Sequence, residues 1–184
     1  GDRPAHLFQL EERDDLALAN RLSRLEQLPD RLPVIDEIVR RSNKQTFRGF
    51  EFRCVQHLLG AQAAMFDGLE KMGMSKARTT IIGVPYSSSA DVTDTMADDG
   101  WDVRRPPLDI EATEDAVREG LRERIAAALE SGNKCIVIDD GGMVVQLLAS
   151  DPELKEHAGL FRIVEQTRRG ITVADSVELR APVV

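Results

Sequence analysis

Short apolar runs alternate with longer helical patterns from residue 50 almost to the end of the chain. Runs of about five residues rich in Val, Ile and Phe are typical of buried strands. The runs here are FEFRCVQ, TTIIGV, WDVRR, CIVID and LFRIVE, at residues 50–56, 79–84, 101–105, 135–139 and 160–165. The alternation predicts right-handed crossovers and a three-layer, doubly wound α/β fold of the Rossmann type, with a mainly parallel sheet of about five strands.

Capping and breaking residues place the helices between these runs. We expect helices at 58–72, 91–98 and 143–149, the first of them stopped by Gly73. Thr113 predicts the N-cap of a further helix that ends at Gly132. One face of that helix would present residues that recur once per turn, namely Val117, Leu121, Ile125 and Leu129.

The beginning of the chain is charged and favours helices. Leucines at 16, 18, 22 and 25 give it an apolar side, and Leu28-Pro29-Asp30 breaks the pattern. A helix through Ile35, Ile38 and Val39 should follow, with Pro33 near its first turn. Since 184 residues suffice for one substantial core, we expect an N-terminal helical segment at 1–28 and one α/β domain at 29–184.

Charge and hydropathy exclude several classes of partner. The chain has 24 basic and 32 acidic residues, a net charge of −8, which gives no diffuse positive field for nucleic acid or an anionic membrane. No stretch approaches the roughly 20 apolar residues of a transmembrane helix, and the first residues lack the layout of a signal peptide. We therefore expect a cytoplasmic protein with neither a nucleic-acid nor a membrane partner.

The two cysteines indicate neither a disulfide framework nor a metal site. Cys54 and Cys135 each lie inside an apolar run typical of a buried strand. We expect both to be buried free thiols.

Polar residues follow the first and second predicted strands, where a doubly wound sheet binds its ligands. His57 comes directly after the first strand and could donate a hydrogen bond to a ligand hydroxyl, or only to its own loop. Ser87 belongs to the run Pro85-Tyr86-Ser87-Ser88-Ser89-Ala90-Asp91 after the second strand. These hydroxyls could contact a sugar or an amino acid, or they could cap the next helix.

The last two strands end in more specific patterns. CIVID runs into Asp139-Asp140-Gly141-Gly142, in which the glycines permit a tight turn and close ligand approach, although one aspartate could serve only as a helix cap. LFRIVE runs into Gln166-Thr167-Arg168-Arg169-Gly170, where the arginines could also be solvated surface. No dinucleotide loop, P-loop or zinc-type histidine cluster is present, so the sequence predicts no cofactor and no metal site within this chain.

These two patterns resemble those of the S-adenosylhomocysteine hydrolases. That family has a strand ending in Asp-Asp-Gly-Gly-Asp and, about 25 residues later, Glu-Glu-Thr-Thr-Thr-Gly; here Asp139-Asp140-Gly141-Gly142-Met143 and Glu165-Gln166-Thr167-Arg168-Arg169-Gly170 stand at like spacing. The stretch from Leu32 to Ala64, LPVIDEIVRRSNKQTFRGFEFRCVQHLLGAQAA, is similar to the family's entry, which ends in a Cys-Leu-His strand. The similarity spans residues 28–184.

The resemblance implies an adenosine-binding domain that works with a separate NAD-binding domain. NAD oxidises the 3'-hydroxyl in that family, so that homocysteine can be eliminated and water added. By position, His57, Asp140 and Thr167 would face the ligand, and Gln166 replaces the glutamate that grips the sugar. We add Ser87 and Arg168 as substrate-binding candidates and Asp140 as the candidate catalytic residue; Arg168 and Arg169 would favour an anionic group.

Substitutions within the motifs leave other functions open. Leu59, Met143, Arg168 and Arg169 depart from the family's pattern, and the chain stops at Val184, where the family continues toward its NAD domain. We expect the substrate-binding part of a longer NAD-dependent protein, inactive alone, with a nucleoside-like ligand and, as in the family, a homo-oligomeric state. The alternatives are a non-catalytic interaction or regulatory module, and a biosynthetic enzyme of altered specificity.

Overall fold

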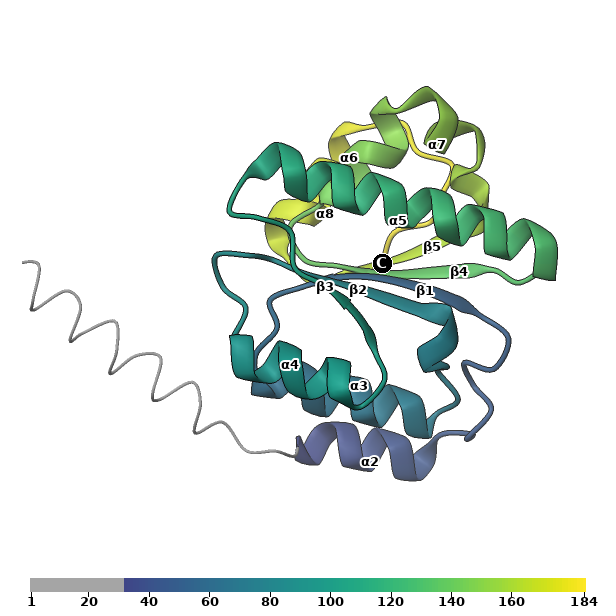
Figure 1. Ribbon diagram of the computed structural model, residues 1–184. Helices are drawn as coiled ribbons and strands as arrows, with labels where there is room; N and C mark the ends of the chain where they lie inside the picture. The colour runs from purple at the N-terminus through teal and green to yellow at the C-terminus, as the bar shows by residue number, and fades with distance from the viewer. Residues whose placement is uncertain (1–31) are drawn as a thin grey trace, which may run out of the picture.

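Five parallel strands form a single sheet in the order β3-β2-β1-β4-β5 (Figure 1). The structure, a computed structural model, describes residues 32–184. The strands are β1 (Glu51–Gln56), β2 (Thr79–Gly83), β3 (Asp102–Arg104), β4 (Cys135–Asp139) and β5 (Phe161–Glu165). The predicted doubly wound α/β architecture is therefore confirmed, and the direction of winding reverses between β1 and β4.

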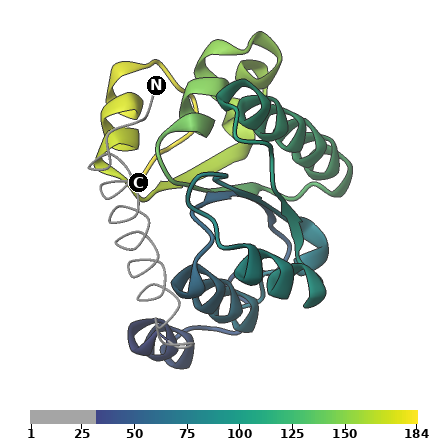
Figure 2. The same ribbon diagram turned by 60° about the vertical axis from the view of Figure 1, so that its left-hand side comes forward.

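The described residues form seven α-helices, six of which cover the two faces of the sheet. One face is covered by α3 (Gly60–Lys71) and α4 (Ala90–Asp98), the other by α5 (Ile110–Ser131), α6 (Met143–Ser150), α7 (Pro152–Glu156) and α8 (Arg168–Ser176) (Figure 1). The helix expected around Ile35 is α2 (Pro33–Arg41); it packs on α3 outside the sheet (Figure 2). Two short 3₁₀ turns, Lys76–Arg78 and Ala158–Leu160, precede β2 and β5. The predicted segment 1–28 lies outside the described residues.

Strand position in the sheet explains the burial of each strand. β1 is central, and all six of its residues are buried, because helices cover both of its faces. β5 is nearer the edge and alternates, with Arg162 and Val164 exposed between buried neighbours. Cys54 and Cys135 are buried and unbridged, as expected, and burial raises the pKa of both thiols to about 12.

The start of α5 differs from the prediction. Asp109 is the N-cap, its carboxylate accepting from the N–H of Glu111, and Thr113 lies inside the first turn, where its hydroxyl donates to the Asp109 carbonyl. Thr113 was a suitable cap by type, but the N-cap lies four residues earlier, because Asp109 is a stronger cap and its carboxylate accepts from the Glu111 N–H. Leu129 is exposed, and Ala128 takes the buried place after Ile125, because 3.6 residues per turn moves a strict four-residue spacing off the buried face.

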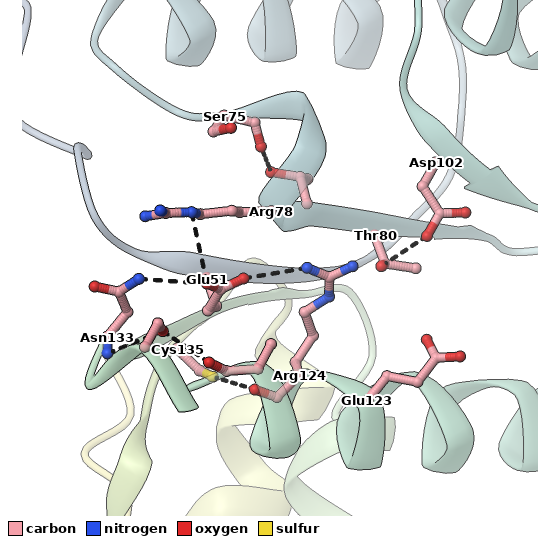
Figure 3. Close-up of polar contacts among 12 residues, drawn as sticks. Glu51, Ser75, Arg78, Thr80, Asp102, Glu123, Arg124, Asn133 and Cys135 are labelled. Carbon is pink, nitrogen blue, oxygen red and sulfur yellow. Dashed lines mark hydrogen bonds and ion pairs between the residues drawn. The ribbon is translucent and has the colours of Figure 1, made fainter. Parts of the chain in front are cut away.

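Charged residues are buried at the amino edge of the sheet, opposite the candidate site. The Glu51 carboxylate lies 3.1 Å from Arg124 Nη1 and 3.8 Å from Arg78 Nε, and it accepts from Asn133 Nδ2 (Figure 3). These pairs join the start of β1 to α5 and to the loops before β2 and β4. Their place at this edge indicates a role in stability, because ligands of such sheets bind at the other edge.

Arg53 is the largest side chain that is fully buried. Its guanidinium donates to the Ala116 carbonyl and lies directly under Gly120, where a Cβ would come within 2.3 Å of it. Burial lowers the pKa of Arg53 to about 9. α5 therefore needs glycine at position 120 to pack on β1.

The end of the chain runs beside β5. Ile163 N–H donates to the Pro182 carbonyl, Val184 N–H to the Ile163 carbonyl and Glu165 N–H to the Val184 carbonyl. These parallel hydrogen bonds cover the outer edge of β5. The sequence analysis did not predict this pairing, because the apolar segment Ala181-Pro182-Val183-Val184 is too short to indicate a strand. Within residues 32–184, no helix combines the length and apolar character needed to cross a bilayer.

Candidate functional site

The candidate residues lie where the winding of the sheet reverses. His57 follows β1 and Asp140 follows β4, and these two strands are neighbours in the sheet although about 80 residues separate them in sequence. Ser87 comes from the loop after β2, and Gln166 from the end of β5. The carboxyl edge of the sheet therefore brings together four sequence-distant loops.

A buried carboxylate, that of Glu165, holds two of these loops together. Its Oε1 accepts from Gly141 N–H at 3.2 Å and from the Thr167 N–H and hydroxyl at 2.8 and 2.7 Å. Its Oε2 accepts from Gly142 N–H at 3.0 Å. Glu165 thus ties the β4–α6 turn to the start of α8 and orients both, rather than facing a ligand.

Close packing beneath this carboxylate requires glycine. A Cβ on Gly170 would come within 2.0 Å of the Glu165 carboxyl carbon. Gly142 has φ +80°, and a Cβ there would lie 2.9 Å from the Cα of Gly170. Gly142 and Gly170 therefore allow the β4–α6 turn to approach α8 closely.

The two adjacent aspartates have different roles. The Asp139 side chain is fully buried and accepts from the N–H of Val144 at 2.9 Å and from Asp140 N–H at 3.1 Å, so it caps α6, as one interpretation of the pair predicted. Burial, with Glu165 nearby, raises the pKa of Asp139 to about 7.

Asp140 instead points toward His57. One of its carboxylate oxygens lies 3.5 Å from His57 Nε2, with the Asp140 side chain 17% and the His57 side chain 28% exposed. Loss of hydration raises the pKa of Asp140, Glu165 adds to that rise, and His57 opposes it. The other ring nitrogen of His57, Nδ1, hydrogen-bonds the Ser87 hydroxyl.

A cavity of about 280 Å³ opens on the α5 side of this edge. Asp140 and Gly141 form part of its wall, together with the loops after β2 and β3 and the first turns of α5 and α6. Its polar lining includes Asp109, Thr113, Glu114, Gln146 and Arg169. Apolar side chains exposed at its rim are Tyr86, Leu108 and Ile110.

Of the six predicted ligand contacts, only Asp140 lines this cavity. His57 and Ser87 contact each other next to Asp140, but neither forms part of the cavity wall. The other three have different places. Thr167 caps α8, because its hydroxyl accepts from Gly170 N–H and donates to Glu165. Gln166 is exposed, with its amide nitrogen 3.9 Å from the sulfur of Met65 on α3. Arg168 is exposed on the first turn of α8, whereas its neighbour Arg169 reaches the cavity wall.

Several lining residues escaped the sequence analysis. Leu108, Ile110 and Glu114 follow the Pro106-Pro107 pair after β3, and nothing in their types suggests a site. Position was the signal that could have found them, since they too come after the carboxyl end of a strand.

The residues of this edge do not fit a dinucleotide. A Rossmann pyrophosphate site needs glycines in the first βα turn, so that the backbone can approach the phosphates. The β1–α3 turn instead contains His57, Leu58 and Leu59. Among residues 32–184, no group of three or more His, Cys, Asp or Glu side chains could hold a metal ion.

The chain matches no protein-family model, and no curated protein sequence is significantly similar to it. The resemblance to the S-adenosylhomocysteine hydrolases therefore rests on the strand-end residues described above.

Proposed function

We propose that this chain binds a nucleoside or a related small molecule at the carboxyl edge of its sheet, as the substrate-binding part of an S-adenosylhomocysteine hydrolase-like protein. The observation that supports this most is the cavity next to Asp140, at the reversal point between β1 and β4. Its volume of about 280 Å³ is close to the lower end of small-molecule sites, which span roughly 300–1,000 Å³.

The lining of the cavity matches a neutral, partly apolar ligand. Val55, Val84 and Met143 offer apolar surface for a flat base, while Asp140 and Gln146 offer acceptors and donors for hydroxyl groups. Because Asp109, Glu114 and Asp140 outnumber Arg169 at the wall, a strongly anionic ligand such as a nucleotide would be disfavoured. The family's NAD-dependent chemistry would need residues beyond this chain, since the β1–α3 turn has no glycine loop.

Isothermal titration calorimetry with adenosine and with S-adenosylhomocysteine tests the proposal. We expect micromolar to millimolar binding of at least one of them, weakened about tenfold or more in Asp140→Asn, which removes a charged acceptor from the wall. Asp98→Asn, on the exposed end of α4, should bind like the unmodified chain. Absence of heat with both ligands, from a folded protein, would rule the proposal out.

A second candidate is an interaction module that has kept the fold without the ligand. The exposed apolar rim favours it, since Tyr86, Leu108 and Ile110 are 76%, 81% and 67% exposed. If this rim joins two copies of the chain, light scattering should show a dimer or larger species that Leu108→Asp dissociates. A monomer at all concentrations would exclude this form of the second candidate.

A further inference from the structure

We propose that Ser87, His57 and Asp140 form a nucleophilic relay able to hydrolyse small uncharged carboxylic esters. The three side chains come from the loops after β2, β1 and β4 and meet at the carboxyl edge of the sheet. The Ser87 hydroxyl hydrogen-bonds His57 Nδ1, and His57 Nε2 lies 3.5 Å from the Asp140 carboxylate. A hydroxyl, an imidazole and a carboxylate in this sequence of contacts are the components of serine hydrolysis.

The contacts of His57 define which nitrogen holds its proton. A carboxylate only accepts hydrogen bonds, so the proton of the neutral imidazole belongs on Nε2, facing Asp140. Nδ1 is then an acceptor, and the Ser87 hydroxyl donates to it. Ser87 is thereby placed to lose its proton to His57, with the ring held by Asp140, which acts as a positioning residue.

The Ser87 backbone N–H donates to the Val84 carbonyl at 3.2 Å, but the Ser87 hydroxyl contacts His57 rather than the backbone. Ser88 Oγ donates to the Val84 carbonyl and accepts from Leu58 N–H, so it joins the ends of β1 and β2. Ser89 is the N-cap of α4. The Ser87 hydroxyl is thus directed to the imidazole rather than to a cap or a turn, which is the contact a nucleophile needs.

The start of α4 supplies donors for a negatively charged oxygen. α4 begins at Ala90, three residues after Ser87, and the Ser89 side chain forms no capping hydrogen bond. The first N–H groups of an α-helix have no partner within the helix. Those of α4 come shortly after Ser87 in the chain, and the proposal assigns them to the oxyanion of a tetrahedral intermediate.

The reaction follows from these parts. Ser87 Oγ attacks the ester carbonyl carbon while its proton moves to His57 Nδ1, and the carbonyl electrons move onto oxygen. When the carbonyl re-forms, the bond to the alcohol breaks, and His57 gives its proton to that alcohol. Water then attacks the acyl-serine by the same path, releasing the acid and regenerating Ser87.

The neighbouring cavity indicates which esters would fit. Its wall contains Asp140 together with Asp109 and Glu114, so an anionic substrate would be repelled. Tyr86 lies on its rim and contacts His57 edge-on, with ring centroids 5.8 Å apart. An uncharged ester with a small acyl group and an apolar alcohol suits this combination.

A fluorophosphonate probe tests the nucleophile directly, because an activated serine displaces its fluoride and forms a stable bond from serine oxygen to phosphorus. We expect the full chain to be labelled at Ser87, as located by peptide mass spectrometry, and to hydrolyse p-nitrophenyl acetate. Ser87→Ala should abolish labelling, and His57→Ala should slow it about 100-fold or more. Ser89→Ala, two residues away, should be labelled normally.

Variants of Asp140 distinguish a role in holding the His57 ring from a role in the stability of the fold. Asp140→Asn should lower the rate of labelling at least tenfold, and Asp140→Glu should restore part of it, with both variants folded by circular dichroism. An unlabelled wild-type chain overturns the proposal, as does labelling at another residue or labelling that does not depend on His57. The labelling experiment detects a covalent bond to Ser87. A negative result would therefore leave the separate proposal of nucleoside binding at the cavity untouched.

Discussion

At the scale of single residues, two adjacent carboxylates at the end of β4 have opposite surroundings. Asp139 is enclosed and accepts two backbone N–H groups, whereas Asp140 is partly exposed and faces His57. Strand geometry explains the difference, because successive side chains point to opposite sides. An Asp-Asp pair at a strand end therefore gives one structural and one accessible group, and the sequence alone does not tell which is which.

Asp139 should make the stability of the protein depend on pH. Its pKa is raised from 3.8 to about 7 in the folded protein, so folding favours the protonated form of Asp139. The contribution of Asp139 to the free energy of unfolding is therefore complete below about pH 4 and is lost as the pH rises through 7. At about 1.4 kcal/mol per pKa unit, the full effect is on the order of 4 kcal/mol. The free energy of unfolding of the wild type, minus that of Asp139→Asn, should therefore fall between pH 4 and pH 8 in urea titrations.

Asp98→Asn is the matched control for this pH dependence. Asp98 is exposed on α4, so its variant should differ from the wild type by a nearly constant amount over the same pH range. If the free energy of unfolding of the wild type, minus that of Asp139→Asn, rises with pH instead, the raised pKa of Asp139 is contradicted.

At the scale of elements, the turn between β4 and α6 should tolerate no side chain at Gly142. Gly142 and Gly132 have nearly the same left-handed backbone, with φ +80° and +70°. A Cβ at Gly132 meets nothing within 4 Å, but one at Gly142 lies 2.9 Å from the backbone of Gly170. We expect Gly132→Ala to cost about 1 kcal/mol and Gly142→Ala to cost about 1–3 kcal/mol more, measured by urea unfolding. Equal costs would show that α8 can move away.

Local patterns were sufficient to predict the elements of the sheet but not their mutual packing. Each of the five apolar runs became a strand, because buried parallel strands are short and apolar and are bounded by helix signals. α7 and α8 were missed, since one has five residues and the other begins with two arginines and a glycine. Asp109 and Thr113 are both suitable caps by type, and the structure shows that the Asp109 carboxylate makes the capping hydrogen bond.

The same limit applied to the candidate site. The rule that ligands bind beyond strand ends was enough to bring His57, Ser87 and Asp140 to one edge of the sheet. It did not reveal that the Thr167 hydroxyl caps α8 or that the Glu165 carboxylate joins two turns. Those roles depend on distances between segments remote in sequence, which composition and spacing do not contain.

At the scale of the whole molecule, the last residues of the chain complete the sheet. Deleting 181–184 would remove three backbone hydrogen bonds to β5 and expose the apolar surface around the buried Ala181. We expect a loss of about 2–4 kcal/mol in the free energy of unfolding, and stronger aggregation through the open strand edge. Val184→Thr, which keeps the backbone, is the control and should change stability little, since that side chain is 77% exposed.

The parallel pairing of this segment with β5 also has a practical consequence for protein production. Because Val184 lies beside Glu165, the last residue of β5, it ends at the edge where His57 and Asp140 are found. An affinity tag joined to Val184 would leave the protein at this edge of the sheet, where a polyhistidine could supply a false imidazole. Titration and labelling should therefore use a chain whose carboxyl terminus is free of added sequence.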